Sequence, residues 1–173
     1  MIFFEVILLI FASFFAGIIN SIAGGGSFLT FPALVFTGVP TIAANATSAV
    51  AVFPGYLSGA LGFAKELREV PKYKFFLLII LSVLGGILGS VLLLITPSDV
   101  FSFVIPWLLG FATILFTFGN YISKWAEKTN GSGGTMGSIA TLVVCIYGGY
   151  FNGGLGIILL ALFSALGMRD IHL

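Results

Sequence analysis

The sequence predicts an all-α protein that crosses a membrane several times, and two observations support this fold class. Of the 173 residues, 59% are hydrophobic and only 8% are charged, whereas a soluble domain carries about 25% charged residues. The charges are also clustered, which leaves four long uncharged intervals: 6–64, 75–98, 100–123 and 129–168. A helix needs about 20 apolar residues to cross the bilayer core, so each interval holds at least one span. We therefore expect a polytopic transmembrane helix bundle with the lipid bilayer as its surroundings.

The first span is expected at residues 2–22. A cleaved signal peptide is the competing interpretation, because Ser21 and Ala23 place small residues at a plausible cleavage position. The apolar stretch is longer than a signal peptide requires, no Lys or Arg precedes it, and Glu5 has the wrong sign of charge. These features favour a retained transmembrane helix.

A glycine run and a short apolar segment follow this span. The run is Gly24–Gly26, and the segment covers residues 28–37 before a turn at Gly38-Val39-Pro40. Ten helical residues rise only about 15 Å, half of the hydrocarbon thickness. We expect a half-length or re-entrant helix, with Ser27 at its start.

Three longer spans are expected in the middle of the chain. The first covers residues 42–63 and is interrupted by Pro54-Gly55, because proline and glycine weaken a helix. The other two, residues 75–95 and 100–119, are uninterrupted and are joined by a tight turn at 96–99.

A polar linker divides the chain into two membrane parts. It covers residues 123–136 and contains a Gly- and Ser-rich run typical of loops. The last hydrophobic stretch, 139–166, is broken by the glycine-rich segment 148–156. We accordingly expect a first membrane repeat at 1–122 and a partial second repeat at 137–173.

Lys and Arg in the short loops predict the orientation. Four of the seven lie at 65–74 and two lie at 124–128. Two uninterrupted spans separate these loops, so both face the same side, and the positive-inside rule makes that side cytoplasmic. The turn at 96–99 then lies outside.

An internal repeat relates residues 17–43 to residues 148–172. Each copy has a helical span, a glycine break near an asparagine, a half-length apolar segment and a turn that begins with glycine. The first copy continues into a further span at Ala44, whereas the second stops at Leu173 where that span is expected. We expect the second repeat to be incomplete in this chain.

The two glycine breaks are the best candidates for a functional site. Opening a helix inside the bilayer costs several kcal/mol for each backbone group that is left unsatisfied. Matching breaks in two repeats predict a substrate site between them, where half-helix N-termini offer N–H groups and a positive dipole end to an anion. No charged residue falls inside a span, so the site would depend on backbone dipoles and neutral side chains. The candidate substrate-binding residues are Asn20, Gly24, Gly25, Gly26, Ser27, Asn45, Thr47, Ser48, Asn152, Gly153, Gly154 and Gly156.

Close helix packing is the alternative explanation for small and polar residues in a membrane. We favour it for three glycine pairs at Gly-xxx-Gly spacing, Gly55/Gly59, Gly85/Gly89 and Gly149/Gly153. For the runs Gly24–Gly26 and Gly153–Gly156 we favour a functional break, because packing does not require a triple glycine. Hydrogen bonding between helices explains Asn45 and Thr47 almost as well as substrate binding does.

The sequence offers no set of residues for catalysis. We find no nucleophile–base pair, no carboxylate pair and no metal-ligand spacing, and the single cysteine, Cys145, lies in an apolar run. His172 is interpreted as a turn residue. We expect no enzymatic activity, no cofactor or metal, and no nucleic-acid partner.

Several of these motifs resemble a known transporter family. The block Gly17-x-x-Asn20-x-x-Ala23-Gly24-Gly25-Gly26 and the block Ala44-Asn45-Ala46-Thr47-Ser48 resemble the sulfite exporter TauE/SafE family, and Tyr147–Gly156 with Gly167–His172 is similar to its second repeat. The resemblance implies a two-repeat transporter in the cytoplasmic membrane. It would export small anions such as sulfite, sulfonates or related organic anions by alternating access around a midplane site.

The resemblance is incomplete at the C-terminal end. Family members continue past the position of His172 with an Asn-Ala-x-Lys stretch and further spans. The resemblance therefore implies that a second copy or the missing C-terminal half takes part in transport. The alternative is a non-transporting truncated membrane protein, or one chain of a larger assembly.

Overall fold

The computed structural model describes residues 2–62, 64–65, 71–128 and 135–165. Within these ranges the chain is helical and contains no strand. The helices are α1 (Ile2–Ala23), α2 (Ser27–Phe36), α3 (Thr41–Gly62), α5 (Lys72–Ile95), α6 (Ser98–Lys128), α7 (Thr135–Tyr150) and α8 (Leu155–Ala165).

The helices present the apolar surface of a membrane protein. α1, between Phe3 and Ser21, and α5, from Lys72 to Ile95, are each long and apolar enough to cross a bilayer. Large side chains such as Phe11 on α1 are exposed in the isolated chain. A soluble protein rarely exposes continuous apolar faces, so these faces belong against lipid. The predicted all-α membrane fold is confirmed.

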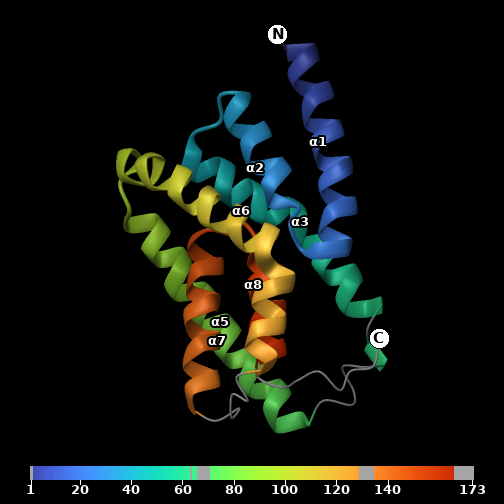
Figure 1. Ribbon diagram of the computed structural model, residues 1–173. Coiled ribbons are helices and arrows are strands. Elements are labelled where there is room, and N and C mark those ends of the chain that lie inside the picture. The colour runs from blue at the N-terminus through green and yellow to red at the C-terminus, as the bar shows by residue number, and fades with distance from the viewer. Residues whose placement is uncertain (1, 63, 66–70, 129–134, 166–173) are drawn as a thin grey trace.

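Two groups of helices build the molecule (Figure 1). α1, α2 and α3 pack on one another, while α5 packs along α7 and α6 packs on α8. α7 also contacts α8, and α3 contacts α6, which joins the groups. The buried core lies where they meet and includes Phe31, Ala44, Leu93, Phe101 and Phe151.

Small residues allow α5 and α7 to approach closely. Gly85 and Gly89 on α5 are buried, and a Cβ atom on Gly85 would overlap the Cβ of Cys145 on α7. In the reverse direction, a Cβ on Gly149 would overlap the carbonyl of Gly86. The packing interpretation of Gly85/Gly89 is confirmed. It also explains why Gly149 lies inside α7, although the sequence placed it in the break at 148–156.

The predicted interruption of the third span was wrong. α3 continues without a break from Thr41 to Gly62, with Pro54 inside it. A proline in a membrane helix removes one backbone hydrogen bond, and neighbouring helices and side chains can compensate for the loss. A single Pro-Gly pair therefore does not open this helix, whereas the glycine run at 24–26 does.

The predicted linker at 123–136 is helical in its first part, because α6 continues to Lys128. Its last residues, Lys124-Trp125-Ala126-Glu127-Lys128, include good helix formers and no glycine. The glycine-containing part of the linker, 129–134, lies outside the described residues. The Arg169 and His172 positions of the second repeat also lie outside them.

Candidate functional site

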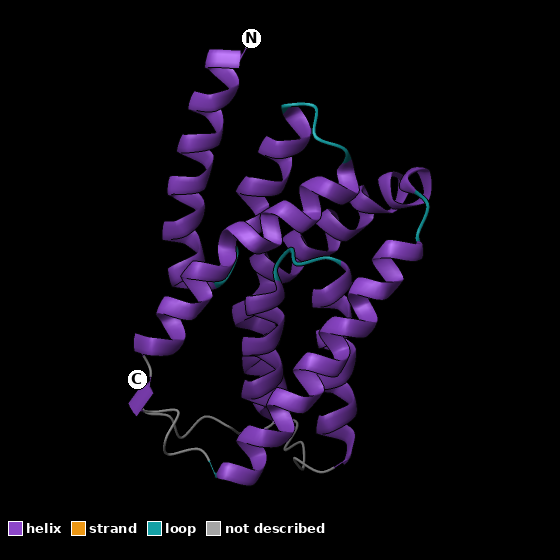
Figure 2. Cartoon of the chain, turned by 180° about the vertical axis from the view of Figure 1, so that it is seen from behind, coloured by secondary structure: helices purple, strands orange, loops and turns teal. Residues whose placement is uncertain are grey.

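Both predicted helix breaks are present. α1 ends at Ala23 and α2 begins at Ser27, while α7 ends at Tyr150 and α8 begins at Leu155. Gly24 and Gly154 have φ angles of 67° and 72°, in the left-handed region that favours glycine. Figure 2 shows the short loop between α7 and α8 near the centre of the molecule. The glycines therefore reverse the chain direction at these points.

The two breaks contact each other although they are far apart in the sequence. A Cβ atom on Gly24 would lie 2.8 Å from the Cα of Gly156, so only glycine allows this approach. Asn152 Nδ2 donates a hydrogen bond of 3.3 Å to Ser27 Oγ. The rings of Phe31 on α2 and Phe151 in the second break also pack edge to face, with their centroids 5.7 Å apart. The N-termini of α2 and α8 thus start from one common region.

α3 supplies further polar groups to this region. Asn45 Nδ2 donates to the Tyr150 carbonyl at the end of α7, at 2.9 Å. Ser48 Oγ and Thr30 Oγ1 share a hydrogen bond of 2.5 Å. These contacts attach α3 to both the short helix α2 and the end of α7.

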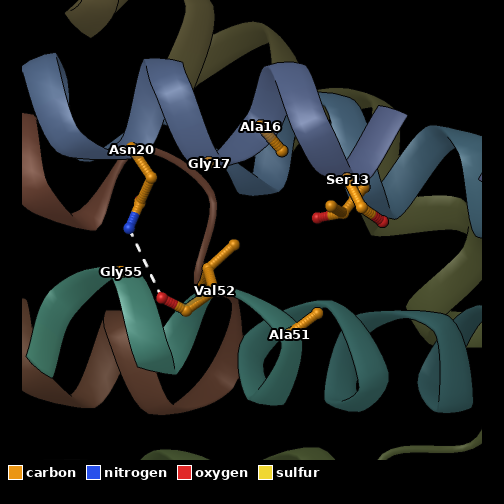
Figure 3. A pocket seen from close by; sticks show the side chains of 8 residues that line it. Ser13, Ala16, Gly17, Asn20, Ala51, Val52 and Gly55 are labelled. Atoms are coloured by element: carbon orange, nitrogen blue, oxygen red, sulfur yellow. Dashed lines mark hydrogen bonds between the residues drawn. The ribbon is translucent and has the colours of Figure 1, made fainter. Parts of the chain in front are cut away.

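Asn20 connects the first break to α3. Its Nδ2 donates to the Val52 carbonyl at 3.4 Å, and its Oδ1 accepts from the Gly26 N–H at 3.4 Å. Figure 3 shows Asn20 reaching across from α1 toward α3. A small cavity of about 50 Å³ lies beside it, also lined by Thr30 and Gly55. Asn20 therefore fixes the geometry of the Gly24–Gly26 loop.

The polar side chains at the breaks are buried and uncharged. Asn20, Ser27, Asn45 and Asn152 are 6%, 5%, 5% and 8% exposed. The intervals 6–64 and 129–168 carry no charged residue, so the fixed charges here are the partial charges of the helix ends. The N-termini of α2 and α8 are positive dipole ends, which favour an anion.

Several buried donors in this region have no acceptor within the described part of the chain. Ser27 accepts from Asn152, but neither its hydroxyl hydrogen nor its N–H group has an acceptor among those residues. The same holds for the N–H groups of Gly25 and Gly153. Buried donors normally find a partner, so this group of donors is suited to a ligand with oxygen acceptors.

The structure brings most of the predicted site residues together and leaves one apart. Thr47 is exposed on α3, because a helix turns about 100° per residue and Asn45 already faces inward. The contacting group comprises Asn20, Gly24, Gly26, Ser27, Asn45, Ser48, Asn152, Gly154 and Gly156, with Gly25 and Gly153 in the same loops.

Sequence reasoning missed three residues of this region. Thr30 follows Ser27 by three positions and so shares its face of α2, which is a signal that the sequence does contain. Tyr56 donates its hydroxyl to the Gly24 carbonyl at 3.2 Å, and Tyr147 donates to the Gly153 carbonyl at 2.8 Å. The two tyrosines carry no such local signal.

Apolar helices that meet at two internal breaks define a class of protein, the helical membrane proteins with discontinuous helices. The model of the family described as "Sulfite exporter TauE/SafE" matches residues 9–173. The chain belongs to this family.

Curated relatives carry transporter names. The chain is 31% identical over 157 residues to a "Probable membrane transporter protein" of Haemophilus influenzae, covering 90% of this chain and 61% of the relative. It is 35% identical over 98 residues to "Probable membrane transporter protein ORF9" of Sinorhizobium sp, covering 57% of this chain and 37% of the relative. For "Probable membrane transporter protein YfcA" of Escherichia coli K12 the identity is 28% over 148 residues, covering 86% of this chain and 55% of the relative. The chain thus spans less than two thirds of these relatives, and no solved structure matches it.

Proposed function

We propose that this chain is the site-bearing part of a transporter that exports small anions, such as sulfite, sulfonates or related organic anions, across the cytoplasmic membrane. The anion binds where the helix breaks at 24–26 and 151–154 meet, and alternating access around that site moves it across. The observation that carries the proposal is the cluster of buried donors at two helix N-termini that contact each other. An oxyanion supplies the acceptors that these donors lack.

The surroundings of the breaks support an anion with an organic group as well as a bare inorganic one. A second cavity of about 230 Å³ borders the first break, and it is lined by Ile19, Gly25, Phe28, Leu29 and Thr113. An apolar cavity of about 150 Å³ can hold a benzene ring, so this one has room for a small apolar substituent. The anionic end would then face the neighbouring N–H groups.

Export by cells that express the protein from its own gene tests the proposal. Replacing Gly25 and Gly26 with Leu is expected to abolish the flux of sulfite and of methanesulfonate. A Cβ on Gly26 alone would lie 2.8 Å from the Ala16 carbonyl and 3.0 Å from the Asn20 Cβ, so the larger side chains close the break. Membrane insertion is expected to persist, because α1 keeps its full apolar length.

Gly59→Leu is the matched control for this experiment. Gly59 lies on α3, and a Cβ there would meet no atom within 4 Å. Flux through this variant is expected to equal that of the wild type. Unchanged flux in the Gly25 and Gly26 variant, at equal membrane abundance, would contradict the proposed site.

A further inference from the structure

The C-terminal end of α7 carries backbone carbonyls that have no donor in the described part of the chain. A helix leaves its last carbonyls without partners inside the helix itself. Here the Tyr150 carbonyl accepts from the side chain of Asn45 on α3. The carbonyls of Gly148, Gly149 and Phe151 accept no hydrogen bond from the described residues. Unbonded oxygens therefore gather where α7 ends and the second break begins.

Two buried asparagines add side-chain oxygens to this group. Asn45 Nδ2 donates to the Tyr150 carbonyl at 2.9 Å, and Asn152 Nδ2 donates to Ser27 Oγ at 3.3 Å. Neither Oδ1 accepts a hydrogen bond from the described residues, although Asn45 and Asn152 are only 5% and 8% exposed. Buried polar atoms normally have a partner, so each of these unpaired oxygens indicates a ligand.

The unpaired oxygens come from one short segment and from one helix held against it. The carbonyl of Tyr150 and the N–H of Phe151 form a single peptide unit, so the amide group of Asn45 lies at the start of the second break. The Oδ1 of Asn45 is two bonds from the nitrogen that makes this contact. Asn152 follows Phe151 in the chain, and Phe151 itself is 1% exposed. The oxygens of Asn45, Phe151 and Asn152 are thus buried around one peptide segment.

A monovalent cation suits these oxygens. The C-terminus of a helix is the negative end of its dipole and favours positive charge. The oxygens are all neutral, whereas Ca²⁺ and Mg²⁺ are bound through carboxylates. Among the residues that the structure describes, no group of three His, Cys, Asp or Glu side chains could hold a metal ion. In secondary transporters with discontinuous helices, unwound carbonyls and half-helix C-terminal ends coordinate Na⁺.

We propose that the end of α7 binds a Na⁺ ion through the Phe151 carbonyl, Asn152 Oδ1 and Asn45 Oδ1. The Gly148 and Gly149 carbonyls supply further negative partial charge at the same helix end. The ion links α3 to the second break, because Asn45 comes from α3 and the other two ligands come from the break. The inference goes beyond the proposed function, since it assigns a second ligand to this region. Sequence motifs for metals did not predict it, because a site of neutral oxygens needs no cluster of ionisable residues.

Thermal unfolding of the purified chain in detergent tests the cation site with none of the proposed anionic substrates present. The midpoint is measured in choline chloride and in mixtures where NaCl replaces choline chloride at constant ionic strength. A ligand that binds only the folded state raises the midpoint. We expect a saturable rise of about 3 to 6 °C once Na⁺ reaches about tenfold its dissociation constant.

The variants Asn45→Ala and Asn152→Ala test the proposed ligands. Each removes one oxygen, so each is expected to lose most of the rise that Na⁺ produces in the wild type. Asn20→Ala is the matched control, because Asn20 is equally buried at the first break and both ends of its amide are already bonded. It is expected to lower the midpoint in both salts and to keep the full rise with Na⁺.

Asn152→Asp tests the same ligand in the opposite direction. It places a carboxylate where the neutral oxygen was, and a charged ligand binds a cation more strongly. The Na⁺ concentration that gives half of the maximal rise is therefore expected to fall by about tenfold. A merely structural role for Asn152 would leave this concentration unchanged.

The outcomes separate this inference from the proposed function. Equal midpoints in NaCl and choline chloride would overturn the cation site, and anion flux through the Gly25 and Gly26 variant would still test the anion site by itself. Loss of the rise with Na⁺ in Asn20→Ala, to the same extent as in Asn45→Ala and Asn152→Ala, would overturn the assignment of the ligands.

Discussion

Individual polar residues hold the centre of this protein together with neutral hydrogen bonds. Asn20 bonds to α3 and to the Gly26 N–H, and Asn152 joins the second break to Ser27. Asn45 bonds to the carbonyl of Tyr150, which is the last residue of α7. In the lipid interior such bonds contribute about 0.6 to 1.7 kcal/mol each, so their effect is to specify which helices meet.

Asn45→Ala is expected to lower the stability of the protein in detergent by about 1 kcal/mol, because it leaves the Tyr150 carbonyl without its donor. The thermal midpoint of unfolding, followed by circular dichroism, measures this loss. Thr47→Ala is the matched control, since Thr47 lies exposed two residues further along the same helix. Equal effects of the two substitutions would contradict the assignment of Asn45 to the contact between α3 and α7.

At the scale of helices, glycine has two separate uses in this fold. In the loops at 24–26 and 151–154 it permits left-handed backbone conformations and ends a helix inside the molecule. In α5 and α7 it removes side-chain volume, so that the two helices pack with their backbones close together. The α5–α7 contact therefore depends on which glycines face the partner.

Gly89→Ala is expected to destabilise the α5–α7 contact by about 1 to 3 kcal/mol, a typical cost of overpacking. The added methyl group would overlap the Ile146 carbonyl on α7. Gly86→Ala is the control on the same helix, because a Cβ at Gly86 would meet no atom within 4 Å. Thermal unfolding in detergent compares the two variants, and a larger loss for Gly86→Ala would refute the packing described here.

At the scale of the whole molecule, the positively charged loops predict how the chain sits in the membrane. α5 begins at Lys72, α6 ends at Lys128, and Figure 1 shows these two ends at the same end of the bundle. The turn between Ile95 and Ser98 lies at the opposite end of α5. The start of α5 and the end of α6 therefore lie on one side, as the sequence predicts, and the cytoplasmic identity of that side stays a prediction.

Cysteine labelling in whole cells tests this orientation. In a Cys145→Ser background, Asp99→Cys is expected to react with a membrane-impermeant maleimide in intact cells. Lys74→Cys is expected to react only after the membrane is permeabilised, because the positive-inside rule predicts a cytoplasmic position for it. Labelling of Lys74→Cys in intact cells would contradict the predicted orientation of the chain in the membrane.

Features that depend on local composition could be predicted from the sequence. The membrane class follows from uncharged intervals, and both helix breaks follow from runs of glycine. The errors were also local: Pro54 does not interrupt α3, and Gly149 packs inside α7. For Gly149 the neighbouring helix α5 decides the outcome, which a single segment does not reveal. The division into two repeats and the substrate-binding role of the break residues stay predictions.

The sequence by itself determined that this protein is helical, lies in a membrane and opens two helices at glycine, because hydropathy and backbone freedom are properties of each segment alone. Only the tertiary structure decided that the breaks touch at Gly24 and Gly156, that Tyr56 and Tyr147 occupy their carbonyls, and that Thr47 faces away. These are contacts between distant segments. They depend on how whole helices pack, and the packing fixes which donors remain free.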